Sequence, residues 1–229
     1  EKEIVKTEIS SSKKNKNESK IKEEKIEITS SKTLNIMETE IENIQVIQIS
    51  QNTSIAQISS KIIEKQEELD LIENRLKQKV NFKLKGITYK LIYRASRDGE
   101  REFHNNCNNC HQSLCVIKTK KGYKFGGYTK LDWNGKDIEK ADSYSFVFSL
   151  DYLTIYNIKN RKNSIYCDSN YGPCFSGVFY ISNKCLSEKS QLCLYDESNY
   201  SDIKYDYEFT DVEKFFYIED LEVFKINFY

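Results

Sequence analysis

Apolar and polar residues alternate along much of the chain after residue 81, as they do in half-buried β-strands. The alternation is clear at Ile87, Tyr89, Leu91 and Tyr93, whose neighbours are mostly polar. Further strands are predicted at residues 114–119, 123–129, 144–150, 152–158, 165–167, 175–181, 203–209 and 222–228. Since strands far outnumber helices, residues 81–229 are expected to form an antiparallel, sandwich-like domain with one or two helices.

Upstream of this region, residues 36–80 follow a different period. Positions in steps of three and four are mostly apolar, and neither Pro nor Gly interrupts them. The seam comprises Ile41, Ile44, Ile55, Ile58, Ile62, Leu69, Ile72 and Leu76, with Gln48, Gln51 and Lys65 as polar breaks. A stripe only two positions wide favours a coiled coil over a broad domain face. The alternative is a single helix lying on the domain that follows.

Residues 1–35 consist largely of Lys, Glu, Ser and Asn with isolated Ile, and show no sustained period. Such a segment buries too little apolar surface to fold alone, so we expect it to be disordered or weakly helical. Three regions are therefore predicted, with boundaries at residues 1–35, 36–80 and 81–229.

Charge and composition narrow the function. The chain has 35 basic and 35 acidic residues, which argues against bulk binding of nucleic acid because phosphates require a basic surplus. No apolar run is long enough to cross a membrane, and the stretch EKEIVKTEIS lacks the apolar core of a secretory signal. The seven Cys form an odd number, so reduced thiols in the cytoplasm are expected.

The stretch FHNNCNNCHQSL contains Cys107, Cys110 and His111 in the CxxCH spacing of c-type haem attachment. A haem also needs a distant axial ligand, but the other candidates, Met37 and His104, lie in the upstream helical segment and on the same predicted helix. We therefore expect no haem and no other cofactor.

The same stretch is compatible with two further chemistries in part. Zinc would require four converging ligands, and no second CxxC pair exists to complete the site. A catalytic Cys–His pair would require an orienting group and a cleft, which the sequence does not show. The alternative is a purely structural role. A helix would place Phe103, Cys107, Cys110 and Leu114 on one face, so that both thiols pack in the core and bind nothing.

Several short motifs occur in the order of a known family. They are YRASRDG at 93–99, Phe103-His104, Cys107, Leu114, GYKFGGY at 122–128, Trp133, SFVFSL at 145–150 and FYIEDLEVF at 216–224. Together they resemble the TLDc domain over residues 84–229. Cys110 and His111 depart from the family pattern, and the region around Gly172 has fewer glycines than is usual.

The family-motif positions receive no assigned role beyond structure or partner binding. They are Asp98, Gly99, Phe103, His104, Cys107, Gly122, Phe125, Gly126, Gly127, Tyr128, Trp133, Phe146, Phe148, Ser149 and Glu222. From the residues alone, Gly126 and Gly127 indicate a bulge or a close backbone approach. Asp98 is expected to cap a helix, Trp133 to anchor the core or a loop, His104 to be hydrogen-bonded, and Glu222 to face solvent or a sheet edge.

The resemblance implies two antiparallel sheets packed as a sandwich with short peripheral helices, here preceded by a long helix, an α+β fold that is mainly β. It also implies a eukaryotic, non-catalytic protein-interaction module of oxidative-stress resistance that binds and regulates the vacuolar-type proton ATPase. Such a protein would be cytoplasmic and would reach an acidic organelle through its partner. The alternatives are a metal-binding or redox-active protein that uses Cys107, Cys110 and His111, and a structural adaptor whose coiled coil sets the partner and mediates self-association.

Overall fold

A computed structural model describes residues 36–37, 58–79, 85–159, 163–193, 200, 203, 207–210 and 213–229. The chain divides into two compact units, Glu1–Gln51 and Asn52–Tyr229. Of the first unit only Ile36 and Met37 are described, and both are helical and exposed. The predicted seam residues Ile41, Ile44 and Ile55, and the whole segment 1–35, lie outside the described residues.

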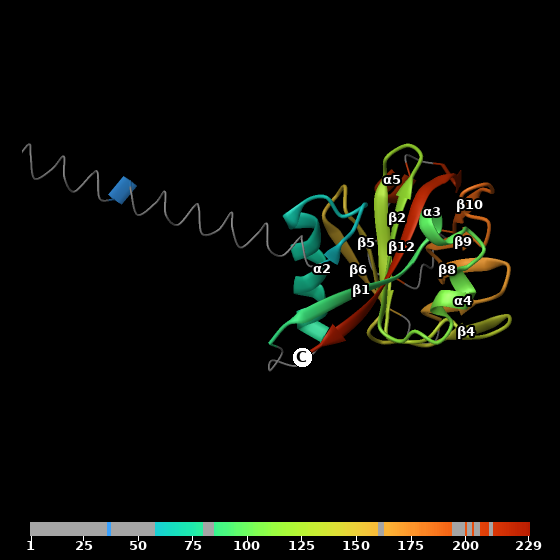
Figure 1. The fold of residues 1–229 in the computed structure, drawn as a ribbon, viewed down its shortest axis with the longest axis horizontal. Helices are drawn as coiled ribbons and strands as arrows, with labels where there is room; N and C mark the ends of the chain where they lie inside the picture. Colours follow the sequence, from blue (N-terminus) through green and yellow to red (C-terminus); the bar gives the residue numbers. More distant parts are fainter. Residues whose placement is uncertain are drawn as a thin grey trace, which may run out of the picture. The chain divides into compact units, whose positions relative to one another are not determined.

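The second unit contains two six-stranded antiparallel sheets (Figure 1). Sheet A has the order β1-β12-β2-β3-β5-β6, and sheet B has the order β11-β10-β9-β8-β7-β4. The strands of sheet A are β1 (Ile87–Arg94), β2 (Ser113–Thr119), β3 (Lys124–Thr129), β5 (Phe146–Ser149), β6 (Thr154–Asn157) and β12 (Ile218–Phe228). Those of sheet B are β4 (Ile138–Lys140), β7 (Ile165–Cys167), β8 (Tyr171–Phe175), β9 (Phe179–Ser182), β10 (Ser190–Leu192) and β11 (Phe215–Phe216). The expected mainly β sandwich is confirmed.

Four described helices accompany the sheets: α2 (Gln66–Lys79), α3 (Ala95–Asp98), α4 (Phe103–Cys107) and α5 (Tyr207–Thr210). Only α2 is longer than five residues. Figure 1 shows α2 on the side of sheet A that faces away from sheet B. The second unit therefore has three layers, namely α2, sheet A and sheet B.

Two hydrophobic clusters lie between these layers, and β2 contributes to both. Cys115 and Ile117 belong to the cluster between the sheets, whereas Leu114 and Val116 belong to the cluster beneath α2. Because both faces of β2 are buried, its sequence is almost continuously apolar rather than alternating. Sheet A is thus the central layer of the unit.

The cluster between the sheets is rich in aromatic rings. Phe125 makes edge-on contacts with Phe179, Phe209 and Phe216, at centroid distances of 5.2–5.6 Å. Such edge-to-face pairs add stability beyond the buried area, on the order of 1 kcal/mol each. They bind strands from the two sheets and α5 into one core.

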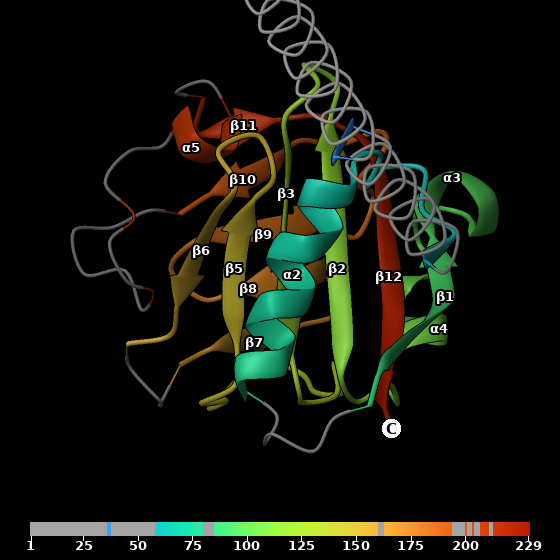
Figure 2. The same ribbon diagram turned by 90° about the vertical axis from the view of Figure 1, so that its left-hand side faces the viewer.

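Helix α2 packs across the outer face of sheet A (Figure 2). Leu69, Ile72 and Leu76 are fully buried in one cluster with sheet residues such as Tyr128 and Phe148. The preceding Ile58 and Ile62 are buried in the same cluster. These five predicted seam residues therefore contact the sandwich of their own chain and are not available for a seam with a second helix.

The expected continuous helix over 36–80 is also wrong in its second half. Residues 59–65 are not helical, and α2 begins at Gln66. A stripe of residues spaced by three and four fits either a partner helix or a sheet, and here the sheet offers the larger apolar face. The sequence pattern alone cannot distinguish these two partners.

Three local predictions differ from the structure. The predicted strand 175–181 is a hairpin, because the chain turns at Gly177 with φ of 75° and joins β8 to β9. The predicted strand 203–209 ends instead in α5. The helix predicted to run from Phe103 to Leu114 stops at Cys107, and Leu114 belongs to β2.

Candidate functional site

Glu222 is the most unusual polar residue of the domain. It lies in β12 between β1 and β2, and its side chain is fully buried. The expectation that it faces solvent or a sheet edge is therefore wrong. In the register of the sheet it stands directly between Arg94 of β1 and Val116 of β2. Cross-strand neighbours on one face are close enough for direct contact.

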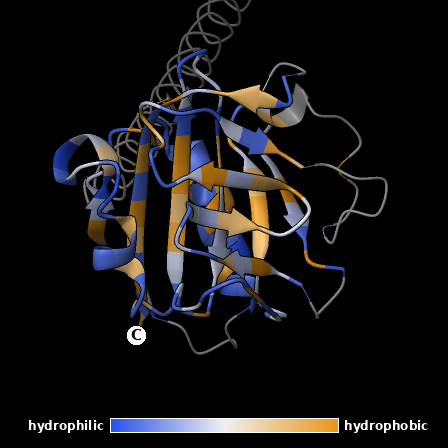
Figure 3. Cartoon of the chain, turned by 90° about the vertical axis from the view of Figure 1, so that its right-hand side faces the viewer, coloured by the Kyte–Doolittle hydropathy of each residue, from blue (hydrophilic) through white to orange (hydrophobic). Residues whose placement is uncertain are grey.

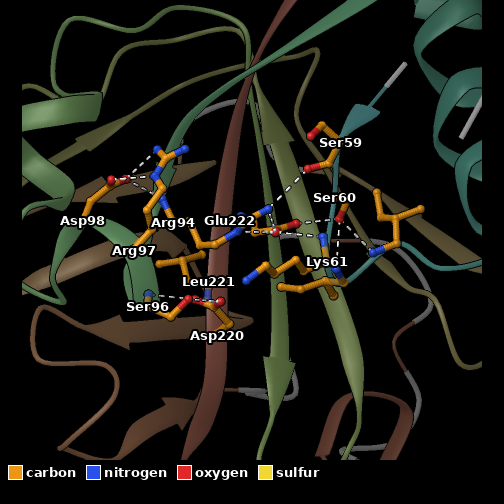
Figure 4. A network of polar contacts seen from close by, with 12 residues as sticks. Ser59, Ser60, Lys61, Arg94, Ser96, Arg97, Asp98, Asp220, Leu221 and Glu222 are labelled. Atoms are coloured by element: carbon orange, nitrogen blue, oxygen red, sulfur yellow. Dashed lines mark hydrogen bonds and ion pairs between the residues drawn. The ribbon is translucent and has the colours of Figure 1, made fainter. Parts of the chain in front are cut away.

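The carboxylate of Glu222 accepts hydrogen bonds from three residues in two segments of the chain (Figure 4). Arg94 donates from Nε at 2.7 Å, and its Nη2 lies 2.6 Å from the same Oε1 atom. The backbone N–H of Lys61 donates at 2.9 Å, and the hydroxyl of Ser60 donates to Oε2 at 2.5 Å. The buried charge is therefore paired and fully hydrogen-bonded, which burial of a carboxylate requires.

Arg94 and Ser60 extend this contact to the residues that precede α2. Arg94 Nη2 donates to the backbone carbonyl of Ser59 at 3.2 Å. Ser60 Oγ accepts the backbone N–H groups of Ile62 and Ile63 at 3.0 and 2.8 Å. We call Arg94, Glu222 and Ser60 the strap anchor, because together they fasten the segment 58–65 to sheet A.

A second anchor lies at the start of α2. Glu68 Oε2 accepts the backbone N–H groups of Glu64 and Lys65, at 2.9 and 3.2 Å. This is the reach-back half of a capping box, which satisfies donors that a helix start leaves free. The other oxygen of Glu68 pairs with buried Lys124 of β3.

The charges of the second anchor support each other. Burial opposes the charge on Lys124, but the hydrogen bond and the charge of Glu68 outweigh it and raise the pKa of Lys124 above its ordinary value. Lys124 and Glu68 thus fix α2 on β3, which lies two strands away from the β12 strand of Glu222.

Asp98 and Asp220 stabilise the short helix α3. Asp98 Oδ2 accepts the backbone N–H of Arg94 at 2.9 Å, and a bidentate pair with Arg97 holds the pKa of Asp98 below its ordinary range. Asp220 accepts the backbone N–H and the hydroxyl of Ser96 at 3.0 and 2.5 Å. Asp98 is the last residue of α3. It is not the N-cap of the helix that begins at Phe103, because Glu102 holds that position.

The CxxCH stretch does not form a ligand set. Cys107 packs in the cluster between the sheets, whereas the exposed His111 has Nε2 3.9 Å from Asp132 Oδ2. Cys110 Sγ donates to the carbonyl oxygen of His111 at 3.4 Å. Across the described ranges, no three His, Cys, Asp or Glu side chains converge as metal ligands would.

All seven thiols are free and buried. Burial is the first cause of a raised pKa in each case. The residues concerned are Cys107, Cys110, Cys115, Cys167, Cys174, Cys185 and Cys193, with the pKa of Cys185 at about 12. A redox-active or nucleophilic thiol needs the opposite shift and an exposed position.

The remaining histidine and the tryptophan have structural contacts. His104 Nε2 donates to the carbonyl oxygen of Tyr171 at 2.7 Å, and Nδ1 lies 2.8 Å from Asn108 Oδ1. Trp133 is buried and donates from Nε1 to Ser113 Oγ at 2.9 Å. Its ring packs edge-on against Phe103 and Phe175. Trp133 is an anchor of the core.

The paired glycines of β3 allow a close approach and not a bulge. Gly126 and Gly127 pair regularly with Val116 and Cys115 of β2. A Cβ on Gly126 would overlap the carbonyl oxygen of Cys115, and a Cβ on Gly127 would lie 2.5 Å from the ring of Phe175. Only glycine fits at either position.

The other family-motif positions serve packing and turns. Gly99 and Gly122 have φ of 102° and 95°, which favour glycine. The buried members are Phe103, Phe125, Tyr128, Phe146, Phe148 and Ser149. The structure does not gather the predicted positions into one cleft. It brings the predicted Glu222 to Arg94 and Ser60. These two residues were not among the predicted site residues.

These features define a class of protein, a β-sandwich whose buried polar groups fasten its own segments together. The model of the TLDc domain family matches residues 57–227, more than half of the chain. The chain therefore belongs to the TLDc family, a protein-interaction type of module linked to resistance to oxidative stress. The matched region begins at residue 57, upstream of the predicted boundary at 81, and includes α2.

None of the curated proteins compared with the chain matches it significantly. Among the described residues, no helix combines the length and apolarity needed to cross a bilayer.

Proposed function

We propose that this chain is a non-catalytic interaction module that binds the vacuolar-type proton ATPase and regulates its assembly during oxidative stress. The observation that carries the proposal is the match of the TLDc family model across the whole sandwich. The module would act on the cytoplasmic side of an acidic organelle and reach the membrane through its partner.

The structure supports a non-catalytic role through the state of its polar groups. Glu222, Asp98 and Asp220 already accept hydrogen bonds from their own chain, and each of the seven thiols is buried. A general acid, general base or nucleophile must instead present a free group to a substrate. No specific observation favours the metal-binding or redox-active alternative.

The direct test is co-purification of the tagged full chain from its source, followed by mass spectrometry. Recovery of subunits of the soluble ATPase sector, above a tag-only control, is the expected result. Adding the purified chain to the isolated ATPase should then change its ATP hydrolysis rate. Absence of every ATPase subunit from repeated preparations of folded chain would reject the ATPase as partner.

A further inference from the structure

One end of the sandwich carries exposed aromatic residues that the strap anchor and the core do not use. The turn after β2 meets the segment that joins β11 to β12, because Lys120 N–H donates to the carbonyl oxygen of Tyr217 at 2.9 Å. Phe215 and Tyr217 flank the buried Phe216 and are 49% and 42% exposed. Two large, half-exposed rings thus lie two residues apart, one on the edge strand β11 and one directly after it.

Three lysines gather on these two rings. Lys120 Nζ lies 5.2 Å and Lys189 Nζ 5.6 Å from the ring centroid of Tyr217, and Lys214 Nζ lies 5.9 Å from that of Phe215. We call Lys120, Lys189, Lys214, Phe215 and Tyr217 the lysine–aromatic patch. These lysines come from three separate segments, so the fold assembles the patch.

Among the described residues, no ion pair neutralises the lysines of the patch. Within the part of the chain that the structure describes, Lys120, Lys189 and Lys214 have no carboxylate within ion-pair distance. Three neighbouring acids that the structure describes pair with other lysines, since Glu213 lies 2.9 Å from Lys121, Glu219 3.3 Å from Lys118 and Glu188 2.5 Å from Lys184. Like charges held over aromatic rings remain available to an anionic ligand.

A recess opens beside the patch, with a volume of about 80 Å³. Lys120 and Tyr217 line it together with Tyr123, Thr210, Phe216 and the ion pair of Lys121 with Glu213. Sheet B also leaves its outer face without a helix among the described residues (Figure 3). A partner could therefore approach sheet B without displacing a helix of the described part of the chain.

We propose that the lysine–aromatic patch docks an acidic protein segment, with carboxylates on the three lysines and an apolar side chain in the recess beside Tyr217. The proposal rests on the proposed function as an interaction module and names the surface it would use. Tyr and Phe are typical anchors of protein interfaces, whereas the surrounding lysines supply orientation and association rate. A nucleic acid is disfavoured because the chain has zero net charge and the patch is short.

The test measures binding of a fluorescein-labelled peptide of glutamates around one central phenylalanine, by fluorescence anisotropy at low salt. The triple variant Lys120→Glu, Lys189→Glu and Lys214→Glu should bind it at least about tenfold more weakly. The matched control is Lys90→Glu, an exposed lysine on β1 of sheet A, which should bind like the wild type. Thermal melting should be unchanged in both variants.

Three results would overturn the proposal. One is equal peptide affinity of the triple variant and the wild type, and another is an equal loss in the Lys90→Glu control. The third is stronger, patch-dependent binding of phosphatidylserine vesicles or of a single-stranded oligonucleotide than of the peptide, which would assign the patch to a membrane or a nucleic acid.

Co-purification of the triple variant separates this inference from the proposed function. If wild type and variant recover the same ATPase subunits in equal amounts, the function stands and the patch is not its docking surface. If the wild type recovers none, the ATPase proposal fails whatever the peptide shows. Loss of the subunits in the triple variant alone supports both.

Discussion

Glu222 shows what a single buried charge does in this fold. It lies on a central strand beneath residues 58–65, and its donors come from that segment and from β1. Removing one member of such a pair leaves the other charge buried and uncompensated, which costs more than the pair itself contributes. Replacing Glu222 is therefore expected to lower the stability of the fold and not to remove a catalytic group.

Glu222→Gln should lower the free energy of unfolding by about 3–5 kcal/mol, because Arg94 then lacks its counter-charge. Urea unfolding followed by circular dichroism measures the change. Glu219→Gln on the same strand is the matched control and should cost less than about 1 kcal/mol, since its pair with Lys118 is exposed. Equal losses in the two variants would contradict the anchor role.

Gly126→Ala tests the close approach of β3 to β2. A Cβ there would overlap the carbonyl oxygen of Cys115 and lie 2.6 Å from the ring of Phe148. Overpacking of this kind costs about 1–3 kcal/mol, measurable as a lower urea midpoint. Gly172→Ala is the control, because its nearest neighbour would lie at an ordinary 3.7 Å. A neutral Gly126→Ala would argue against the tight packing.

Residue roles were only partly predictable from the sequence. Trp133 and Cys107 were expected in the core, and they lie there because large apolar side chains and free thiols favour burial. Glu222 was misplaced because its donors Ser60 and Lys61 are distant in sequence, and alternation along a strand says nothing of what covers each face. Arg94 was missed for the same reason.

At the scale of elements, β-strands were predicted well where one face is polar, as in β1. The hairpin of β8 and β9 was missed because its turn at 176–178 is short and Gly177 is the one glycine within an apolar stretch. Helix α2 forms as predicted, but the favoured partner, a second helix, is wrong, and the alternative of a helix lying on the domain that follows is correct. Its seam packs on sheet A, and the capping contact of Glu68 fixes where it begins.

The upstream heptads lead to a prediction about self-association. The predicted seam residues Ile41, Ile44 and Ile55 lie outside the described residues. We propose that residues 36–57 mediate self-association. In analytical ultracentrifugation the full chain should then sediment as an oligomer and residues 57–229 as a monomer.

Residues 57–229 are the matched comparison for that experiment because they retain α2 and the whole family match. An oligomer of residues 57–229 would place self-association on the sandwich. A monomeric full chain at high concentration would reject the seam.

At the scale of the whole molecule, burial of ionisable groups predicts a loss of stability in alkali. Burial raises the pKa of Cys185 and of Tyr180 to about 12. In the unfolded chain the pKa is about 8.5 for Cys and about 10 for Tyr. Folding therefore keeps their protons, and this contribution is complete below the unfolded pKa and is lost as pH rises towards 12.

The urea midpoint should therefore fall steadily between pH 8.5 and pH 11, while staying nearly constant between pH 7 and pH 8. A thiol reagent at pH 7.5 should modify the native chain slowly and the unfolded chain at all seven Cys. Rapid modification of any thiol in the native chain would instead point to a reactive Cys and revive the redox alternative.

The central claim is that α2 and the preceding residues 58–65 belong to the same folding unit as the two sheets. Native-state hydrogen exchange of the full chain measures this most directly. The amides of α2 and of β2 are expected to open with similar free energies. Glu222→Gln should lower the opening free energies of both elements together. Fast exchange throughout α2, with β2 still protected, would show that the helix is only loosely attached and would contradict the account.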